Sequence, residues 1–367
     1  MNQIDKGRIT SARLMFTIVC FIQSSSLLTS FMTSVTKQDS WLAVLVCTVV
    51  YLPFMFVYRA LIVKFPGLNL LQVFEAVFGK ALGKLVGLLF VWFFFTLAAL
   101  NLSDLGAFAR ETLMEETPNT VLVVVCILVA AMAARQGIRA VAWYSALYMV
   151  VSFTLIAVSV LLLLSRFRLE NFLPMFDQPF SKYLQGIHII ATIPFGELIA
   201  FLMVTPNVDF SKRDVTRSLF LGFVLGALTI AAVVARDTAV LGNTLHMFAL
   251  PSLVALRMVQ LGEALTRMEI LFGIVLIILL FVKITFLLYV SVLSLAQLTG
   301  ARSYKHLTLI SAAFIVAYGQ TLYSDQLRHA LSAQEIVPIA WTFFEFLLPL
   351  VALGVALIRK FPKKKEA

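Results

Sequence analysis

The chain is organised as long apolar runs separated by short polar segments. A helix needs about 20 apolar residues to cross the hydrocarbon core of a bilayer. Runs of about this length predict ten transmembrane helices, and with them an all-α integral membrane protein with a single membrane domain over residues 1–367. The predicted spans are residues 12–35, 41–63, 85–108, 119–135, 140–165, 187–206, 217–242, 269–298, 306–323 and 337–359.

Positive charge marks one side of this predicted domain. The segments before span one and after spans two, four, six, eight and ten hold most of the 29 Lys and Arg residues. The outer loop after span three instead holds acidic residues that include Asp104 and Glu111. Because cytoplasmic loops carry an excess of Lys and Arg, we expect both termini to be cytoplasmic.

The composition agrees with a membrane location. The chain is 61% hydrophobic and 13% charged, whereas soluble domains are about 45–50% apolar and about 25% charged. A formal net charge of +10 would suggest a nucleic-acid partner in a soluble protein. Here the excess of basic residues in cytoplasmic loops explains it better. The lipid bilayer is therefore the expected partner, and no nucleic acid is predicted.

The sixth span is interrupted in its middle by polar and helix-breaking residues. Thr192 is followed by Pro194, Phe195, Gly196 and Glu197. Proline removes a backbone donor and clashes with the preceding turn, and glycine releases the backbone. Irregular backbone at membrane depth is tolerated only inside protein or beside a water-filled cavity. The segment therefore predicts a buried polar site.

The first span contains a second polar interruption. Ser24, Ser25 and Ser26 lie in an otherwise apolar stretch, and adjacent serines can hydrogen-bond locally and loosen a helix. Serines that pack in a helix interface are the structural alternative. Spans one and six hold the same position in two halves of five, which indicates an inverted repeat with a midplane site. We expect the first repeat over residues 12–165 and the second over 187–359.

Among the ionisable residues inside predicted spans, three stand out: Glu197, Lys283 and Glu345. Such residues are costly in a membrane and usually face the protein interior or water. Glu197 or Lys283 is expected to contact a ligand or a coupling proton, and a buried structural ion pair or a neutral hydrogen-bonded acid is the alternative. Glu345 is a further proton-linked candidate, unless it only reaches water near the outer surface.

No pattern in the sequence supports an enzyme. There is no phosphate-binding Gly-rich loop, nucleophile elbow or His-Glu-x-x-His motif. The three cysteines are scattered, without the spacing of a metal site. We therefore predict no catalytic residue, no cofactor and no metal.

Several short motifs together resemble one membrane-protein family. The chain is similar to the B subunit of bacterial spore germinant receptors, the endospore germination permeases of the amino acid/polyamine/cation transporter superfamily. The similarity runs from about residue 8 to 360 and covers almost the whole chain. The motifs are Lys64-Phe65-Pro66-Gly67, Phe78-Gly79-Lys80-Ala81-Leu82-Gly83-Lys84, Glu116-Thr117-Pro118, Arg135-Gln136-Gly137-Ile138, Ile193-Pro194-Phe195-Gly196-Glu197 and Phe281-Val282-Lys283.

The resemblance implies unwound helices one and six and a place in the spore inner membrane. It also implies a complex with an A subunit and a C-subunit lipoprotein that senses a small nutrient germinant, often an amino acid, and triggers germination. The pocket would involve Ser24 to Ser26 and Thr192 to Glu197. Lys283 occupies a region that holds a sodium site in sodium-coupled relatives, where its ammonium group would replace the ion. A proton-coupled amino-acid permease and a structural or ion-conducting scaffold remain the alternatives.

Overall fold

The computed structural model describes residues 4–5, 7–26, 28–114, 116–209, 212–258 and 269–361, which are almost entirely helical. The α-helices are α1 (Ser11–Gln23), α2 (Ser30–Thr36), α3 (Ser40–Lys64), α4 (Leu70–Phe78), α5 (Lys80–Thr112), α6 (Asn119–Arg135), α7 (Ile138–Leu163), α8 (Phe180–Ile190), α9 (Lys212–Leu241), α10 (Pro251–Arg257), α11 (Glu269–Thr299), α12 (Thr308–Leu322), α13 (Gln326–Glu335), α14 (Val337–Thr342) and α15 (Leu348–Ile358). The two short strands are β1 (Ile9–Thr10) and β2 (Val208–Asp209).

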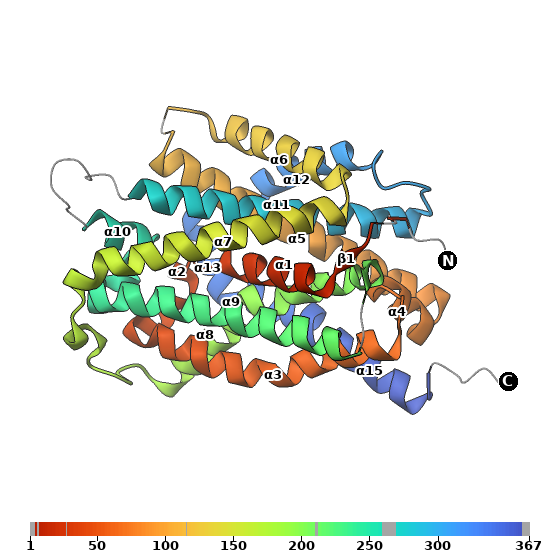
Figure 1. Ribbon diagram of the computed structural model, residues 1–367, viewed down its shortest axis with the longest axis horizontal. Helices are drawn as coiled ribbons and strands as arrows, with labels where there is room; N and C mark the ends of the chain where they lie inside the picture. Colours follow the sequence, from red (N-terminus) through yellow and green to blue (C-terminus); the bar gives the residue numbers. More distant parts are fainter. Residues whose placement is uncertain are drawn as a thin grey trace.

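The long helices run side by side along the longest axis of the molecule (Figure 1). In the described residues, seven helical segments are long and apolar enough to cross a membrane, and α1, α6 and α12 are shorter apolar helices. The predicted class, an all-α multi-pass membrane protein, is thereby confirmed. The count of ten spans stays a prediction, because three of the ten expected helices are shorter than a full crossing.

Helix α1 lies at the centre of the bundle, between α7 and α9 (Figure 1). From Thr17 to Gln23 every residue of α1 is buried, and Ile18, Phe21 and Ile22 are among them. Burial on every side is expected for a helix in the interior of a bundle. Where α9 crosses α1, the glycines Gly222 and Gly226 face Ile18 and Ile22 so closely that a Cβ on Gly226 would lie 2.7 Å from Ile22.

The ends of the chain lie at the same end of the bundle. In Figure 1 the strand β1 and the last turn of α15 are both on the right, next to α4. Strand β1 pairs in parallel with β2, which joins Ile9 to Val208 and Thr10 to Asp209. The segment that precedes the first helix is thus fastened to the segment that follows the sixth predicted span.

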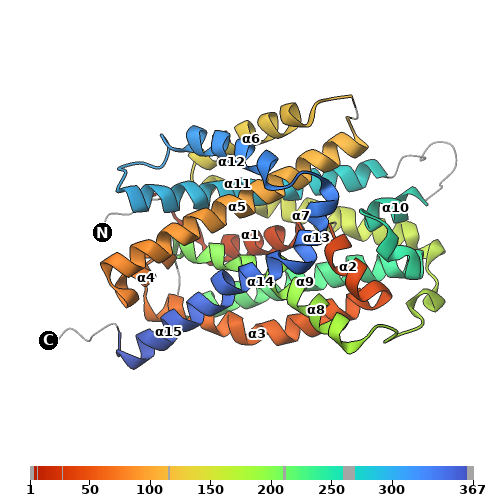
Figure 2. The same cartoon turned by 180° about the vertical axis from the view of Figure 1, so that it is seen from behind.

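Short helices close the opposite end. Seen from behind, α2, α13 and α14 lie together beside the end of α1 (Figure 2), and α2 packs against both α8 and α13. Helix α2 follows the break in the first predicted span, whereas α13 and α14 precede the π-helical turn Phe343–Leu347 in the last one.

Candidate functional site

The first predicted span is broken at its serines. Helix α1 ends at Gln23, and α2 begins at Ser30. The Ser25 amide donates to the Ile22 carbonyl at 3.1 Å, which is a tighter turn than an α-helix makes. The Ser24 hydroxyl donates to the Phe21 carbonyl at 2.6 Å and so competes with helical hydrogen bonding. The expected interruption of the first span is confirmed.

The sixth predicted span is also broken, at the expected residues. Helix α8 continues into a π-helical turn, Ala191–Phe195, and then into a 3₁₀-helix, Gly196–Met203. Ile193 leaves the helical region altogether, with φ −118° and ψ 105°. Proline at position 194 offers no amide hydrogen to the helical ladder. The result is a change of helix type in the middle of the protein, as is common at functional sites.

A lysine on α11 connects the two breaks. The Nζ atom of Lys283 lies 2.6 Å from Oε2 of Glu197, and it donates to the Ser25 hydroxyl at 3.2 Å. It also lies 4.8 Å from the centre of the Phe21 ring, a cation–π distance. The Lys283 and Glu197 side chains are only 1% and 4% exposed. A pair this deeply buried fixes α11 to both discontinuous helices. This arrangement corresponds to the buried structural ion pair that was the alternative to a ligand contact for Glu197 and Lys283.

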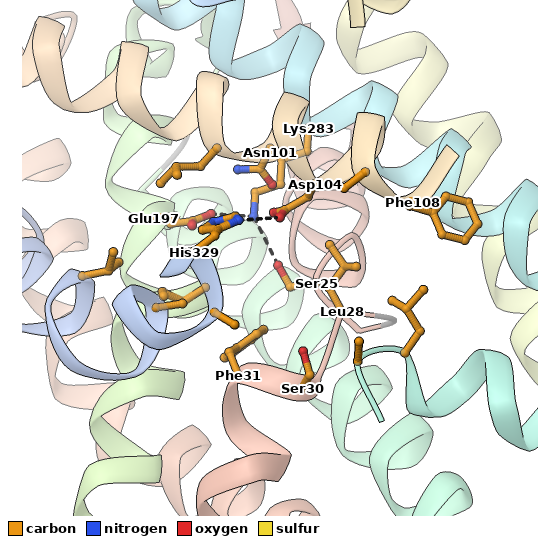
Figure 3. A pocket seen from close by; sticks show the side chains of 18 of the residues that line it. Ser25, Leu28, Ser30, Phe31, Asn101, Asp104, Phe108, Glu197, Lys283 and His329 are labelled. Atoms are coloured by element: carbon orange, nitrogen blue, oxygen red, sulfur yellow. Dashed lines mark hydrogen bonds and ion pairs between the residues drawn. The ribbon is translucent and has the colours of Figure 1, made fainter. Parts of the chain in front are cut away.

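A cavity of about 210 Å³ opens beside this ion pair (Figure 3). It is walled by both breaks, by α5 and α11, and by α13 and α14 on the side of the short covering helices. Its lining residues are Ser25, Leu28, Ser30, Phe31, Leu100, Asn101, Asp104, Ala107, Phe108, Glu111, Ile193, Glu197, Ala249, Leu250, Lys283, His329, Ala330, Ala333, Val337 and Trp341.

Three of the residues expected to bind a ligand line this cavity: Ser25, Glu197 and Lys283. The other expected residues are buried in the two breaks and contribute no lining in the described part of the chain; these are Ser24, Ser26, Thr192, Pro194, Phe195 and Gly196. Among them, Thr192 uses its hydroxyl locally, donating to the His188 and Ile189 carbonyls at 3.0 Å each.

Glu345 is not at the outer surface but is fully buried against the sixth-span break. It lies in a second π-helical turn, Phe343–Leu347. Its carboxylate presses on Gly196, where an added Cβ would lie 2.0 Å from Oε2. The Tyr58 hydroxyl donates to its backbone carbonyl at 2.8 Å. Within the described chain, both carboxylate oxygens lack a hydrogen-bond partner. The alternative that Glu345 simply reaches water is therefore wrong.

Two cavity residues were missed by the sequence reasoning. Asp104 was assigned to an outer loop, but α5 continues to Thr112 and carries Asp104 on its inner face. Its Oδ1 lies 3.4 Å from Nδ1 of His329 on α13. The signal that could have found Asp104 is helical spacing, because Asn101, Asp104 and Phe108 repeat at three and four residues along one lining face.

A further buried charge pair lies on α9, away from the cavity lining. Arg236 donates to Asp237 Oδ1 through Nε at 2.8 Å and through Nη2 at 2.6 Å, and to the Ser159 hydroxyl at 2.6 Å. The Ser252 hydroxyl donates to the other Asp237 oxygen. The cluster therefore ties α7, α9 and α10 together. The sequence signal that could have indicated this cluster is the pair of adjacent opposite charges, Arg236 and Asp237, inside the predicted span 217–242.

Comparison with known proteins now identifies the family. A family model described as spore germination protein matches residues 8–326. The chain belongs to this family. Spore germination protein KB of Bacillus subtilis (strain 168) is 25% identical over 368 residues, which cover 99% of this chain and 98% of that relative. The match agrees with the extent of the resemblance inferred from the motifs.

Solved structures show the fold of this spore germination family member. Mhp1, a nucleobase-cation-symport-1 family transporter in a closed conformation with bromovinylhydantoin bound, has a TM-score of 0.70 at 12% identity, with 98% of this chain and 80% of that chain covered. MhsT in complex with L-phenylalanine has a TM-score of 0.61 at 13% identity, with 95% and 99% covered. The fold is therefore shared with these two transporters, and the family match makes the protein a germination-related membrane protein.

Proposed function

We propose that this protein is the nutrient-sensing membrane subunit of a spore germinant receptor. The observation that carries the proposal is the cavity at two helix breaks, with Ser25, Glu197 and Lys283 in its wall. A small molecule, most simply an amino acid, binds there at the midplane between the broken helices. The protein acts in the spore inner membrane with A and C subunits, and both termini are cytoplasmic.

Sensing requires that the ligand bind one conformation better than another. A ligand shifts an equilibrium only by its difference in affinity for the two states. Residues of both breaks take part, because the Ser24–Ser26 turn and the Thr192–Glu197 segment can each change shape without unfolding a regular helix. We propose that ligand binding changes the relative position of these segments and that the partner subunits respond to the change.

Lys283 and Glu345 are proposed to replace or carry a cation. The Lys283 ammonium joins α11 to both breaks, where this covalently attached positive charge can take the place of a bound coupling cation. Glu345 places a carboxyl group without a hydrogen-bond partner, among the described residues, directly on Gly196. Burial of an unpaired charge is costly, so a carboxyl group in this position is suited to take up and release a proton.

A comparison of cavity variants tests the sensing role. Spores that carry Ser25→Ala should need a different germinant concentration or respond to a different germinant. Ser145→Ala is the matched control, since Ser145 is buried in α7 and donates only to the Val141 carbonyl. If variants of Ser25 and of residues 192–197 all respond as wild type does, ligand recognition lies elsewhere in the complex and this subunit is a scaffold.

An uptake experiment separates a sensor from a proton-coupled amino-acid permease. The purified protein is reconstituted in liposomes with an inward proton gradient, and labelled amino acids that bind it are followed. Binding without uptake is expected for a sensor. Accumulation that collapses when the gradient is removed would instead establish the permease.

A further inference from the structure

A second charged pair faces the cavity, separate from Lys283 and Glu197. Asp104 comes from α5 and His329 from α13, and both point toward the centre of the cavity (Figure 3). Their closest atoms, Asp104 Oδ1 and His329 Nδ1, are 3.4 Å apart. Their side chains are 29% and 14% exposed, so this pair is more open than the Lys283–Glu197 pair.

The two pairs differ in how well their charges are satisfied. The Lys283 ammonium lies 2.6 Å from Glu197 and 3.2 Å from the Ser25 hydroxyl, so its charge is already compensated by these two groups. Charge-assisted hydrogen bonds are usually about 2.7–2.9 Å long. The Asp104–His329 contact at 3.4 Å is longer, and an imidazole is charged only when it is protonated. Of the two cavity carboxylates that have a charged partner, Asp104 therefore has the weaker contact.

The remaining lining favours a cation at the same place. Acidic side chains in the cavity wall are Asp104, Glu111 and Glu197, against the single lysine Lys283. Asn101 lies one turn before Asp104 and donates its Nδ2 to the Leu97 carbonyl at 2.8 Å. Its side-chain oxygen is therefore the group it can offer to a ligand. A carboxylate and an amide oxygen on one helix face suit a donor with several hydrogens, such as a primary ammonium.

We propose that Asp104 binds the ammonium group of the ligand, with Asn101 as a second acceptor, and that the protein selects ligands bearing a primary amine. This inference rests on the proposed function, because it concerns the same cavity. It assigns recognition of the amine to α5 rather than to Glu197, which is already engaged with Lys283. A ligand lacking the amine would leave the Asp104 charge with only its long contact to His329.

His329 serves as a positioning residue for Asp104. Its ring stacks on Tyr323, with ring centres 4.8 Å apart and planes 17° apart, which fixes the direction of Nδ1. His329 also lines a second, more open cleft of about 520 Å³, together with Arg110, Tyr323 and Asp325. It thus stands between this outer cleft and the cavity, where it holds the carboxylate toward an arriving ammonium group.

The test compares ligands that differ only in the amine. The full-length protein is purified in lipid nanodiscs, and the twenty common amino acids are ranked by the stabilisation they give in thermal unfolding. The tightest one is then compared with its deamino acid and its decarboxylated amine. For wild type, removal of the amine should weaken binding on the order of ten- to hundred-fold, the range for a hydrogen bond to a charged group.

Variants assign this preference to Asp104. In Asp104→Asn, the ratio of affinities for the amino acid and its deamino analogue should fall toward one. Glu170→Gln is the matched control, because Glu170 is an exposed acid outside the cavity lining, and its ratio should match wild type. His329→Gln should keep a clear preference for the amine, since it leaves the Asp104 carboxylate in place.

The outcomes distinguish this inference from the proposed function. If Asp104→Asn keeps the wild-type preference for the amine, Asp104 is not the recognition group. Should that variant fail to fold, the wild-type protein alone decides, because equal binding of the amino acid and its deamino analogue overturns the inference. In both cases the proposed function stands as long as amino acids bind. If none of the amino acids binds the wild-type protein, both the inference and the proposed function are refuted.

Discussion

Replacement of Lys283 by methionine is expected to destabilise the protein strongly. The substitution removes the ammonium that lies 2.6 Å from Glu197 and leaves that carboxylate buried without its cation. Methionine has a similar length and fills the same space, so the loss comes from charge rather than from a void. Because Glu197 is almost wholly enclosed, water cannot replace the missing partner.

The magnitude follows from the burial of the pair. Removing one member of a buried ion pair typically costs about 3–5 kcal/mol, because the remaining charge is uncompensated. Loss of the bond from Lys283 to Ser25 contributes about 1 kcal/mol more. Unfolding free energies of proteins are about 5–15 kcal/mol, so this single change consumes a large fraction of the total. An exposed lysine on the polar loops, Lys305, provides the matched control, and its methionine variant should stay within about 0.5 kcal/mol of wild type.

The assay is chemical unfolding in detergent of four proteins: wild type, Lys283→Met, Glu197→Gln and the double variant. Each single variant should lose about 3–5 kcal/mol. The double variant should lose much less than the sum, since neither residue then carries an unpaired charge. Strict additivity, or a loss below about 1 kcal/mol in Lys283→Met, would show that the two groups do not form the closed pair described here. Spores carrying Lys283→Met should also respond poorly to germinant, and a wild-type response would refute the role proposed for its ammonium.

Three further predictions follow from other contacts. Gly196→Ala should lower the stability measured by thermal unfolding by about 1–3 kcal/mol, because its Cβ would lie 2.0 Å from Glu345 Oε2. Adding Glu345→Ala should recover part of this loss. No recovery would exclude this contact as the cause. Asp237→Ala should cost about 3–5 kcal/mol, because Arg236 stays buried without its carboxylate, and thermal unfolding near wild type would contradict this. A hydrogen bond from the Arg328 amide lowers the pKa of Asp325. The ionised carboxylate therefore stabilises the start of α13 at pH values above the unfolded pKa of about 3.9. This contribution disappears as the pH falls through the lowered pKa of the folded state. Protection of the α13 amides, taken at each pH as the intrinsic exchange rate divided by the observed rate, should therefore fall on acidification in wild type but change less with pH in Asp325→Ala.

The features that could be predicted from sequence are those set by local chemistry. Runs of apolar residues give membrane helices because backbone groups in lipid must be satisfied within the segment. The Ser24–Ser26 turn and the Pro194–Glu197 break follow from residues that weaken a helix wherever they occur. Lys283 and Glu197 were recognised as candidates because charges inside spans are rare, although their contact was not predicted.

The features that could not be predicted depend on how the helices pack. Asp104 was counted with the acidic loop after span three, although the predicted span 85–108 includes it, and the packing of α5 against its neighbours places it in the cavity. The contact of Glu345 with Gly196 joins a π-helical turn to the start of a 3₁₀-helix distant in sequence, and no local pattern gives their register. Arg236 and Asp237 are visible as charges inside a span, but their contacts with Ser159 and Ser252 depend on how α7 and α10 pack against α9.

The two charged pairs of the cavity have different roles, because the free energies needed to separate them differ. Opening the enclosed Lys283–Glu197 pair would cost several kcal/mol, which a small ligand could offset only by replacing both partners at once. The Asp104–His329 pair is longer and partly exposed, and such contacts contribute about 0–1 kcal/mol. A ligand can therefore exchange with the second pair at little cost. On this argument Glu197 holds the broken helix to α11, and recognition of the ligand's amine is assigned to Asp104 on α5, which His329 on α13 positions.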